Sequence, residues 1–357
     1  MRGIFYQQNQ KGRLNSLKKD ILSCSLEELY SEMEAIGEKK FRGKQIYEWL
    51  HTKRVHEFSN MSNISSSLRT KLDELYCINS IKIVRKLESS IDNTVKYLYE
   101  LSDGNHIESV LMDYKHGNSL CISTQVGCKM GCNFCASTIA GFKRHLFPSE
   151  MLLQVYEAER DSGRHIDSLV LMGIGEPLDN FNNTIRFLQM ISYETGKNLS
   201  LRHVSLSTCG LVDKIYELAE YRFGLTLSVS LHAVTDEERN KIMPINKQYP
   251  IGTLLKACRD YIEKTGRRIS FEYAVIHGIN DSPADAVALI KLLRGMNCHI
   301  NLIPVNQIKE RDYRSDKNAL YDFLNILDKG GLNATVRRTL GADIDAACGQ
   351  LRREYEI

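Results

Sequence analysis

Three cysteines fall within one stretch of eight residues, at Cys128, Cys132 and Cys135. Thiolates at this spacing can hold zinc or an iron–sulfur cluster. A structural zinc site needs a fourth protein ligand, and no further cysteine or histidine stands beside the triplet at zinc spacing. The pattern therefore favours a four-iron cluster with one iron open to a small chelating ligand, and zinc or unliganded thiols remain the alternatives.

A glycine-rich turn follows the next apolar run, with Gly173, Gly175 and Glu176 directly after SLVLM. Glycine permits close backbone approach to a ligand, and the glutamate offers an anion for an ammonium group. A strand-to-helix turn with a capping glutamate would have the same sequence. Four polar residues stand at the ends of later apolar runs. Such residues more often cap helices or satisfy backbone groups than bind a ligand. These residues are Ser207, Ser230, His232 and Asn306.

The elements that must position these residues alternate in type from Ser119 onward. Short apolar runs predict strands at LCISTQV, SLVLMGI, HVSLST, LTLSVSLHA, RISFEYAVI, HINLIPV and NATVRR. Amphipathic stretches such as PSEMLLQVYEAERD and GTLLKACRDYIEK lie between most of them. This alternation predicts an α/β fold with a parallel sheet covered by helices, in barrel or doubly wound form. Sites in such folds gather at the carboxyl ends of the strands, where the cysteines and polar residues stand.

The first 118 residues have a different pattern. Ser25 and Glu28 have the spacing of a capping box that opens a helix, Gly37 ends that helix, and two further helical runs follow. Later β-rich runs are separated by Asp-Asn and Asp-Gly-Asn turn signals, which indicates antiparallel strands. We therefore expect a small helical N-terminal domain over 1–78, a short antiparallel β connector over 79–118, a core over 119–340 and a C-terminal segment over 341–357.

The composition is that of an ordinary globular protein of 357 residues, with 43% hydrophobic and 25% charged residues. It excludes disordered and fibrous classes, and no apolar run approaches the roughly 18 residues that a membrane span needs. The N-terminus is polar and basic without the apolar region of a signal peptide, so we expect a cytoplasmic protein with reduced thiols. Because the net charge is only +3, any contact with RNA or DNA would depend on local basic patches. These patches lie at 39–44, 143–145, 267–268, 337–338 and 352–353.

Eight segments, taken in order, carry a resemblance to one family: CISTQVGCKMGCNFCAST, LMGIGEPLDN, STCGL, SLHA, IMPIN, FEYAVIHGIND, NLIPVN and GADIDAACGQLRR. They resemble the rRNA/tRNA adenine-carbon-2 methyltransferases, the RlmN family of the radical S-adenosylmethionine (SAM) superfamily, over nearly the whole chain. The resemblance implies a partial (β/α)6 radical SAM barrel and one [4Fe-4S] cluster held by Cys128, Cys132 and Cys135. It also implies SAM contacts from Gly175, Glu176, Ser207, Ser230, Leu231, His232 and Asn306. The sequence departs from the family at Cys209, where serine is commoner, and at His145, where asparagine is commoner.

Three further residues acquire roles from the resemblance. Carbon 2 of adenine is not nucleophilic, so direct methyl transfer would fail, and the family uses two SAM molecules per turnover. One methylates Cys348, in a C-terminal catalytic loop, and the second yields the radical that activates this methyl group for addition to adenine. Cys121 is the expected partner that forms a transient disulfide with Cys348, and Glu108 is the expected proton acceptor. Without the resemblance, both cysteines would be taken as buried core thiols and Glu108 as a solvated strand carboxylate.

The resemblance also implies the partners. They are 23S rRNA in a protein-poor or unassembled large subunit, tRNA as a second substrate, and a low-potential electron donor such as flavodoxin or ferredoxin, acting with a monomeric protein. The target base has to be unstacked, which favours looped or unfolded RNA. Three alternatives stay open: a paralogue that methylates carbon 8 of the same adenine, a non-catalytic iron–sulfur or zinc protein that binds RNA, and a radical SAM enzyme with another substrate.

Overall fold

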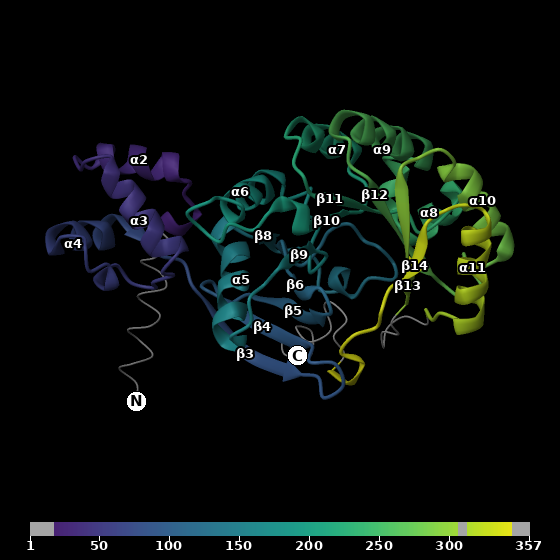
Figure 1. The fold of residues 1–357 in the computed structure, drawn as a ribbon, viewed down its shortest axis with the longest axis horizontal. Helices are drawn as coiled ribbons and strands as arrows, with labels where there is room; N and C mark the ends of the chain where they lie inside the picture. The colour runs from purple at the N-terminus through teal and green to yellow at the C-terminus, as the bar shows by residue number, and fades with distance from the viewer. Residues whose placement is uncertain (1–17, 306–312, 345–357) are drawn as a thin grey trace.

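The computed structural model describes residues 18–305 and 313–344. Helices α2 (Leu26–Ala35), α3 (Phe41–His51) and α4 (Ser66–Leu75) form a group at one end of the molecule (Figure 1). The expected capping box opens α2, because Ser25 Oγ accepts the Glu28 N–H at 3.2 Å and Glu28 Oε2 accepts the Ser25 N–H at 3.0 Å. Strands β1 (Lys19–Asp20) and β2 (Tyr76–Cys77) pair with each other, so the chain enters and leaves this group at one place.

A ten-stranded sheet runs through the rest of the described residues. Its strands are β3 (Ile81–Glu88), β4 (Val95–Leu101), β5 (His106–Tyr114), β6 (Gly117–Cys121), β9 (Ser168–Leu171), β10 (Val204–Thr208), β11 (Thr226–Ser230), β12 (Ile269–Val275), β13 (Cys298–Pro304) and β14 (Ala334–Val336). Their order across the sheet is β14-β13-β12-β11-β10-β9-β6-β5-β4-β3. The strands from β6 to β14 in this sheet are parallel, as predicted, and β3 to β6 are antiparallel neighbours. The β-rich stretch 79–118 is therefore antiparallel as predicted, and it extends the sheet of the core.

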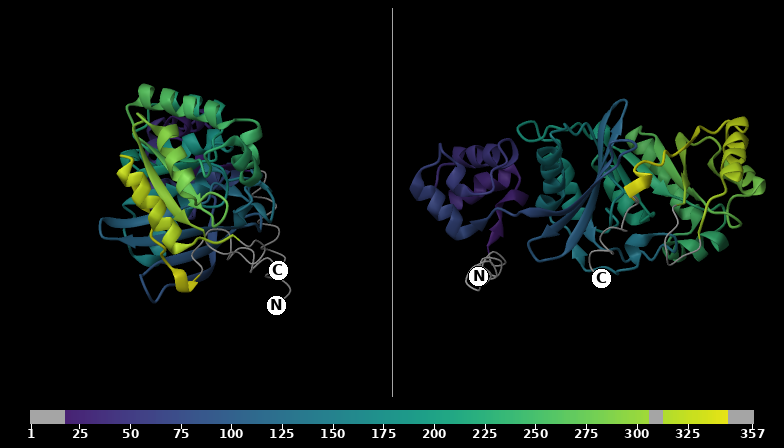
Figure 2. Two further views of the ribbon diagram at one scale, coloured as in Figure 1. Left: turned by 90° about the vertical axis from the view of Figure 1, so that its right-hand side faces the viewer. Right: turned by 90° about the horizontal axis from the view of Figure 1, so that it is seen from below.

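Helices connect successive parallel strands, as the alternating pattern predicts. They are α5 (Pro148–Ser162), α6 (Phe181–Ile191), α7 (Val212–Glu220), α9 (Ile251–Thr265), α10 (Pro283–Leu293) and α11 (Lys317–Lys329). In Figure 1, α7, α9, α10 and α11 lie in an arc outside the strands. The right-hand view of Figure 2 places β3 to β5 between the N-terminal helices and the part of the core that holds α10 and α11. In the described part of the chain, no helix combines the length and the apolarity that a membrane crossing requires.

Several small features were not predicted from the sequence, and two of them lie beside the site. The first is α8 (Asp236–Ile242), whose sequence DEERNKI is too short and too polar to show an apolar face. The second is the antiparallel pair β7 (Gln125–Val126) and β8 (Arg144–His145), which brackets the cysteine loop. The cysteines therefore do not follow the strand β6 directly, because β7 intervenes.

The buried core explains why the strand ends converge. Leu169, Leu206, Leu227, Phe271 and Ile300 come from five adjacent parallel strands, and each is 0% exposed. A central parallel strand covered on both faces needs such apolar side chains. Since these strands run in one direction, their carboxyl ends meet at one edge of the sheet, where the site lies.

Candidate active site

The carboxyl ends of the parallel strands enclose a cavity of about 270 Å³. The cysteine loop after β7 forms one wall, and the ends of β9 to β13 contribute residues to the others. The structure brings eight of the predicted site residues to this cavity. They are Cys128, Cys132, Cys135, Gly175, Glu176, Ser207, Ser230 and His232.

The cysteine loop is closed tightly at its base. A Cβ on Gly127 would lie 1.7 Å from the carbonyl oxygen of Gly141, so only glycine fits at this point of the loop. Cys128 and Cys132 are nearly buried, with exposed fractions of 8% and 9%. Burial raises the pKa of the Cys128 thiol to about 12, a cost that a bound metal centre removes by stabilising the thiolate.

The donors of this loop suit an iron–sulfur cluster. The pKa of Cys132 is raised by burial and then by the neighbouring Cys135 and Cys128, so the three thiols lie within electrostatic reach of one another. In residues 18–305 and 313–344, no three Cys, His, Asp or Glu side chains are grouped so as to hold one metal ion. The case for a cluster therefore depends on two observations. The three donors are thiols, and they line one cavity that has space for the iron and sulfide atoms of a cluster.

Glu176 is held rigidly at the cavity wall. Its Oε2 accepts the Cys209 N–H at 2.7 Å, its Oε1 accepts the Leu178 N–H at 3.0 Å, and its own N–H donates to Gln125 Oε1 at 2.8 Å. Burial raises the pKa of Glu176, and the two N–H donors oppose this rise. A Cβ on Gly175, where φ is +112°, would lie 2.6 Å from the Gln125 Cβ, so the turn requires glycine. This anchored carboxyl group is suited to an ammonium ligand.

His232 presents a neutral imidazole to the cavity. Its Nδ1 accepts the Ala274 N–H at 2.9 Å, so Nε2 carries the proton. Burial, and then the charge of Arg239, lowers the pKa of His232 to about 3. The residue has a φ of +58°, which is uncommon for a residue other than glycine. His232 is therefore a fixed hydrogen-bond donor, suited to a hydroxyl oxygen or a ring nitrogen.

Sequence reasoning missed two charged residues that line the cavity, Glu272 and Arg337. Glu272 is 3% exposed, and its Oε2 accepts the amide of Asn301 at 2.6 Å. Burial raises its pKa, and Arg337 is the first of the groups that oppose the rise. The sequence did carry one sign of a functional role for this residue, because a glutamate inside the apolar run RISFEYAVI is unusual for a buried strand. The sequence predicts that Arg337 belongs to a basic patch for RNA, whereas in the structure it lines the cavity.

Cys121 and Glu108 lie outside this cavity. Cys121 is paired with Val110 of β5, and Glu108 precedes Val110 by two residues, so the three share one face of the sheet. Cys121 is 8% exposed, and burial raises its pKa against the opposing charge of Arg337. Glu108 is 2% exposed and lies 3.3 Å from the Lys96 ammonium, which rules out the alternative of a solvated strand carboxylate.

The remaining predicted residues fall in different places. Leu231 is buried and does not line the cavity, and its N–H donates to the Glu272 carbonyl at 3.0 Å. Asn306 and Cys348 lie outside the described residues.

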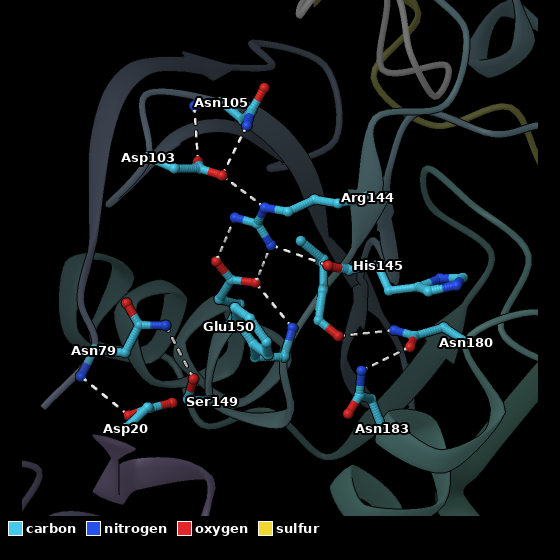
Figure 3. A network of polar contacts seen from close by, with 12 residues as sticks. Asp20, Asn79, Asp103, Asn105, Arg144, His145, Ser149, Glu150, Asn180 and Asn183 are labelled. Atoms are coloured by element: carbon cyan, nitrogen blue, oxygen red, sulfur yellow. Dashed lines mark hydrogen bonds and ion pairs between the residues drawn. The ribbon is translucent and has the colours of Figure 1, made fainter. Parts of the chain in front are cut away.

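Arg144 of β8 fixes the far end of the cysteine loop to the body of the protein (Figure 3). Its guanidinium donates two hydrogen bonds of 2.8 Å to Glu150 and one of 2.6 Å to Asp103. Asn180 holds the other side by donating to the backbone carbonyls of Thr124 and Leu146. The basic patch expected at 143–145 is therefore partly internal, because two carboxylates neutralise its arginine.

Comparison with known proteins gives matches along most of the chain. The family model for the ribosomal RNA large subunit methyltransferase N-terminal domain matches residues 19–78, and that of the radical SAM superfamily matches residues 122–290. A curated relative from Lachnoclostridium phytofermentans, described as "Probable dual-specificity RNA methyltransferase RlmN", is 54% identical over 342 residues and 95% of each chain. A relative of the same description from Clostridioides difficile is 53% identical over 95% of this chain and 99% of its own.

A solved structure agrees with the same comparison. The crystal structure of a radical SAM methyltransferase from Sphaerobacter thermophilus matches with a TM-score of 0.88 and 39% identity. The match covers 93% of this chain and 98% of that one, so it extends over the N-terminal helices as well as the sheet.

Proposed function

The chain belongs to the RlmN family of radical SAM RNA methyltransferases, and on this basis we propose that it methylates carbon 2 of an adenine in 23S rRNA and in tRNA. The observation that carries the proposal is the shared cavity of the three cysteines, Glu176 and His232. It lies at the carboxyl ends of parallel strands, in a chain that matches these methyltransferases over 95% of its length.

The residues of the cavity fall into two groups, one that would bind the cluster and one that would bind SAM. Cys128, Cys132 and Cys135 would hold a [4Fe-4S] cluster, and Glu176 would accept the SAM ammonium. Ser207, Ser230, His232 and Asn306 would contact the rest of SAM, with Gly175 and Leu231 shaping the backbone around it. The reduced cluster, when bound, supplies the electron that cleaves SAM to a carbon radical.

Two cysteines and one glutamate would carry out methyl transfer. The Cys348 thiolate takes a methyl group from a first SAM, and a second SAM activates that methyl group for addition to adenine. Glu108 accepts the proton that leaves carbon 2. The Cys121 thiolate then attacks the Cys348 sulfur, so that an S–S bond forms while the S–CH₂ bond breaks. The electron pair of that bond goes to the carbon on adenine, which takes up a proton. The unpaired electron that radical addition left on the base passes to the oxidised electron donor, and an external thiol reductant reopens the disulfide.

The finer architecture and the partners belong to the same proposal. We infer that β6 and β9 to β13 with their helices are the partial (β/α)6 barrel, and that the C-terminal segment 341–357 is the catalytic loop. Residues 1–78 would bind RNA, and 79–118 would connect that domain to the core over 119–340. The substrate would be rRNA before the large subunit is complete, the electron donor flavodoxin or ferredoxin, and the protein a cytoplasmic monomer.

One experiment tests the reaction. The reduced, cluster-loaded protein is incubated without oxygen with SAM and unmodified 23S rRNA or tRNA, and the nucleosides are analysed by mass spectrometry. We expect 2-methyladenosine from both RNAs and none when SAM is left out. Methylation at carbon 8 would indicate the paralogous reaction. Cleavage of SAM without any methylated adenine would indicate another substrate, and no SAM cleavage would leave a non-catalytic RNA-binding protein.

A further inference from the structure

Arg239 of α8 is fully buried, at 0% exposure, beside the candidate active site. Its guanidinium donates four hydrogen bonds of 2.8 to 3.0 Å. The acceptors are the backbone carbonyls of Leu231, Ser230 and Cys209 and the side-chain oxygen of Asn246. The three carbonyls lie at the carboxyl ends of β10 and β11, where Ser230 and Cys209 line the cavity.

The helix that carries Arg239 is also bonded to the cysteine loop. The N–H of Asn133, the residue after Cys132, donates to the Ile242 carbonyl at 2.8 Å. The Asn133 side-chain amide donates to the Lys241 carbonyl. Helix α8 therefore links the loop of the cluster ligands, through its last turn, to two strand ends of the cavity, through Arg239.

The charge of Arg239 is not neutralised by the groups to which it donates, since all four acceptors are neutral oxygens. A guanidinium stays protonated in proteins, and placing it out of water has a large desolvation cost. Burial lowers the pKa of Arg239, and Cys209 and Cys132 are the first groups that oppose this. Arg239 donates to the Cys209 carbonyl at 2.8 Å, and Cys209 belongs to the same buried hydrophobic cluster as Cys132, so the positive charge lies close to a ligand of the iron–sulfur cluster.

We propose that Arg239 is a positioning residue of the SAM site, and that its positive charge raises the reduction potential of the cluster held by Cys132 and its neighbours. The inference rests on the function proposed above. One electron added to a thiolate-bound cluster makes it more negative, so a nearby buried cation stabilises the reduced form more than the oxidised form. The planar guanidinium group donates to three backbone carbonyls at once. A lysine at this position would keep the positive charge but could not reproduce this set of hydrogen bonds.

Two variants separate the two effects in the cluster-loaded protein. Arg239→Lys keeps the charge, and Arg239→Gln removes it. We expect both to raise the SAM dissociation constant by about tenfold or more, because the ends of β10 and β11 lose their common donor. Redox titration followed by electron paramagnetic resonance should show a potential lower by about 59 mV in Arg239→Gln, a tenfold change in a one-electron equilibrium. Arg239→Lys should keep the wild-type potential.

Lys241→Gln is the matched control, since Lys241 is a cation on the same helix with a side chain that is 65% exposed. Water screens that charge, so neither SAM binding nor the potential should change. A wild-type potential in Arg239→Gln would overturn the electrostatic role, and wild-type SAM binding in both arginine variants would overturn the positioning role. If Arg239→Gln does not fold, Arg239→Lys decides: weaker SAM binding at an unchanged potential supports the inference, and any other result overturns it. A wild-type protein that takes up no cluster would instead refute the proposed function, and this inference with it.

Discussion

Lys96 of β4 and Glu108 of β5 form an ion pair inside the protein, with the Lys96 Nζ 3.3 Å from the Glu108 Oε2. The two side chains are 0% and 2% exposed. Lys96 lies opposite Val110 and Glu108 lies opposite Leu98, so the pair crosses the two strands diagonally. Moving two charges out of water costs several kcal/mol for each, and a buried pair is weak evidence for stability. Glu108 lies on the sheet face that carries Cys121, and the roles proposed for these two residues depend on this placement.

Lys96→Met tests this pair through stability. The substitution leaves the Glu108 charge buried without the ammonium, and we expect the free energy of unfolding to fall by about 3–5 kcal/mol. Adding Glu108→Leu removes the second charge, so the double variant should recover most of the loss. Chemical denaturation of the three proteins side by side measures this. A double variant that is less stable than Lys96→Met would contradict the account.

Gly175→Ala should weaken SAM binding without unfolding the protein. The new Cβ would lie 2.6 Å from the Gln125 Cβ, in a residue whose φ is +112°, so the turn that carries Glu176 must shift. Strain of this kind costs about 1–3 kcal/mol, which corresponds to a rise of about 5- to 150-fold in the SAM dissociation constant. Gly252→Ala is the control, because nothing lies within 4 Å of its Cβ position in α9. That change should leave SAM binding intact and add roughly 0.5–1 kcal/mol of stability.

Cys132→Ala should abolish cluster binding. Cys132 lines the cavity with Cys128 and Cys135, and two thiols are too few to hold the cluster firmly. Iron content and visible absorption after anaerobic reconstitution measure the loss. Cys258→Ala removes a thiol of similar burial from α9, outside the cavity, and should bind iron as the wild type does. Equal iron in the two variants would rule out Cys132 as a ligand.

His51 makes stability depend on pH in the acid range. It is buried in α3, its Nδ1 lies 3.2 Å from the Tyr156 hydroxyl, and burial lowers its pKa to about 3. Below pH 6.5 this histidine is protonated in the unfolded chain but stays neutral in the folded protein. Its contribution to the free energy of unfolding is therefore fully present above pH 6.5 and is lost as the pH falls toward 3. The slope is up to about 1.4 kcal/mol per pH unit for one histidine.

His51→Phe isolates that contribution. Between pH 6.5 and 5, the variant should lose less stability than the wild type. The loss that remains comes from His232, His145 and His299, whose pKa values burial also lowers. Thermal unfolding followed by circular dichroism at several pH values compares the two proteins. An identical acid dependence in both would show that His51 is not kept neutral by the fold.

The strands and the glycine-rich turn could be predicted because their signals are local. Alternating apolar runs and the spacing of Cys128, Cys132 and Cys135 need no knowledge of distant contacts. Arg239 could not be predicted, because its importance comes from carbonyls that lie 8 to 30 residues away in the sequence. Its own segment, DEERNKI, has the composition of an exposed helix.

Charged residues were the hardest to place from the sequence. Arg144 and Arg337 both belonged to expected phosphate-binding patches, yet one is neutralised by Asp103 and Glu150 and the other lines the cavity. A cluster of basic residues in the sequence does not reveal which carboxylates the fold will place beside it. Glu108 shows the same limit, since its partner Lys96 lies on the neighbouring strand and only the strand register brings the two together.

Cys121→Ala should trap the reaction after the methyl carbon has joined the RNA. Cys121 is the expected thiol that attacks the Cys348 sulfur, and without it the S–CH₂ bond to the RNA has no means of breaking. We therefore expect a covalent complex of protein and RNA that survives a denaturing gel, while SAM is still cleaved. Cys348→Ala should give neither the complex nor methylated adenine. Cys298→Ala is the matched control, because Cys298 is also 8% exposed and also lies in a strand of the sheet. It should turn over normally, and the absence of any RNA-linked species in Cys121→Ala would refute the resolving role of that thiol.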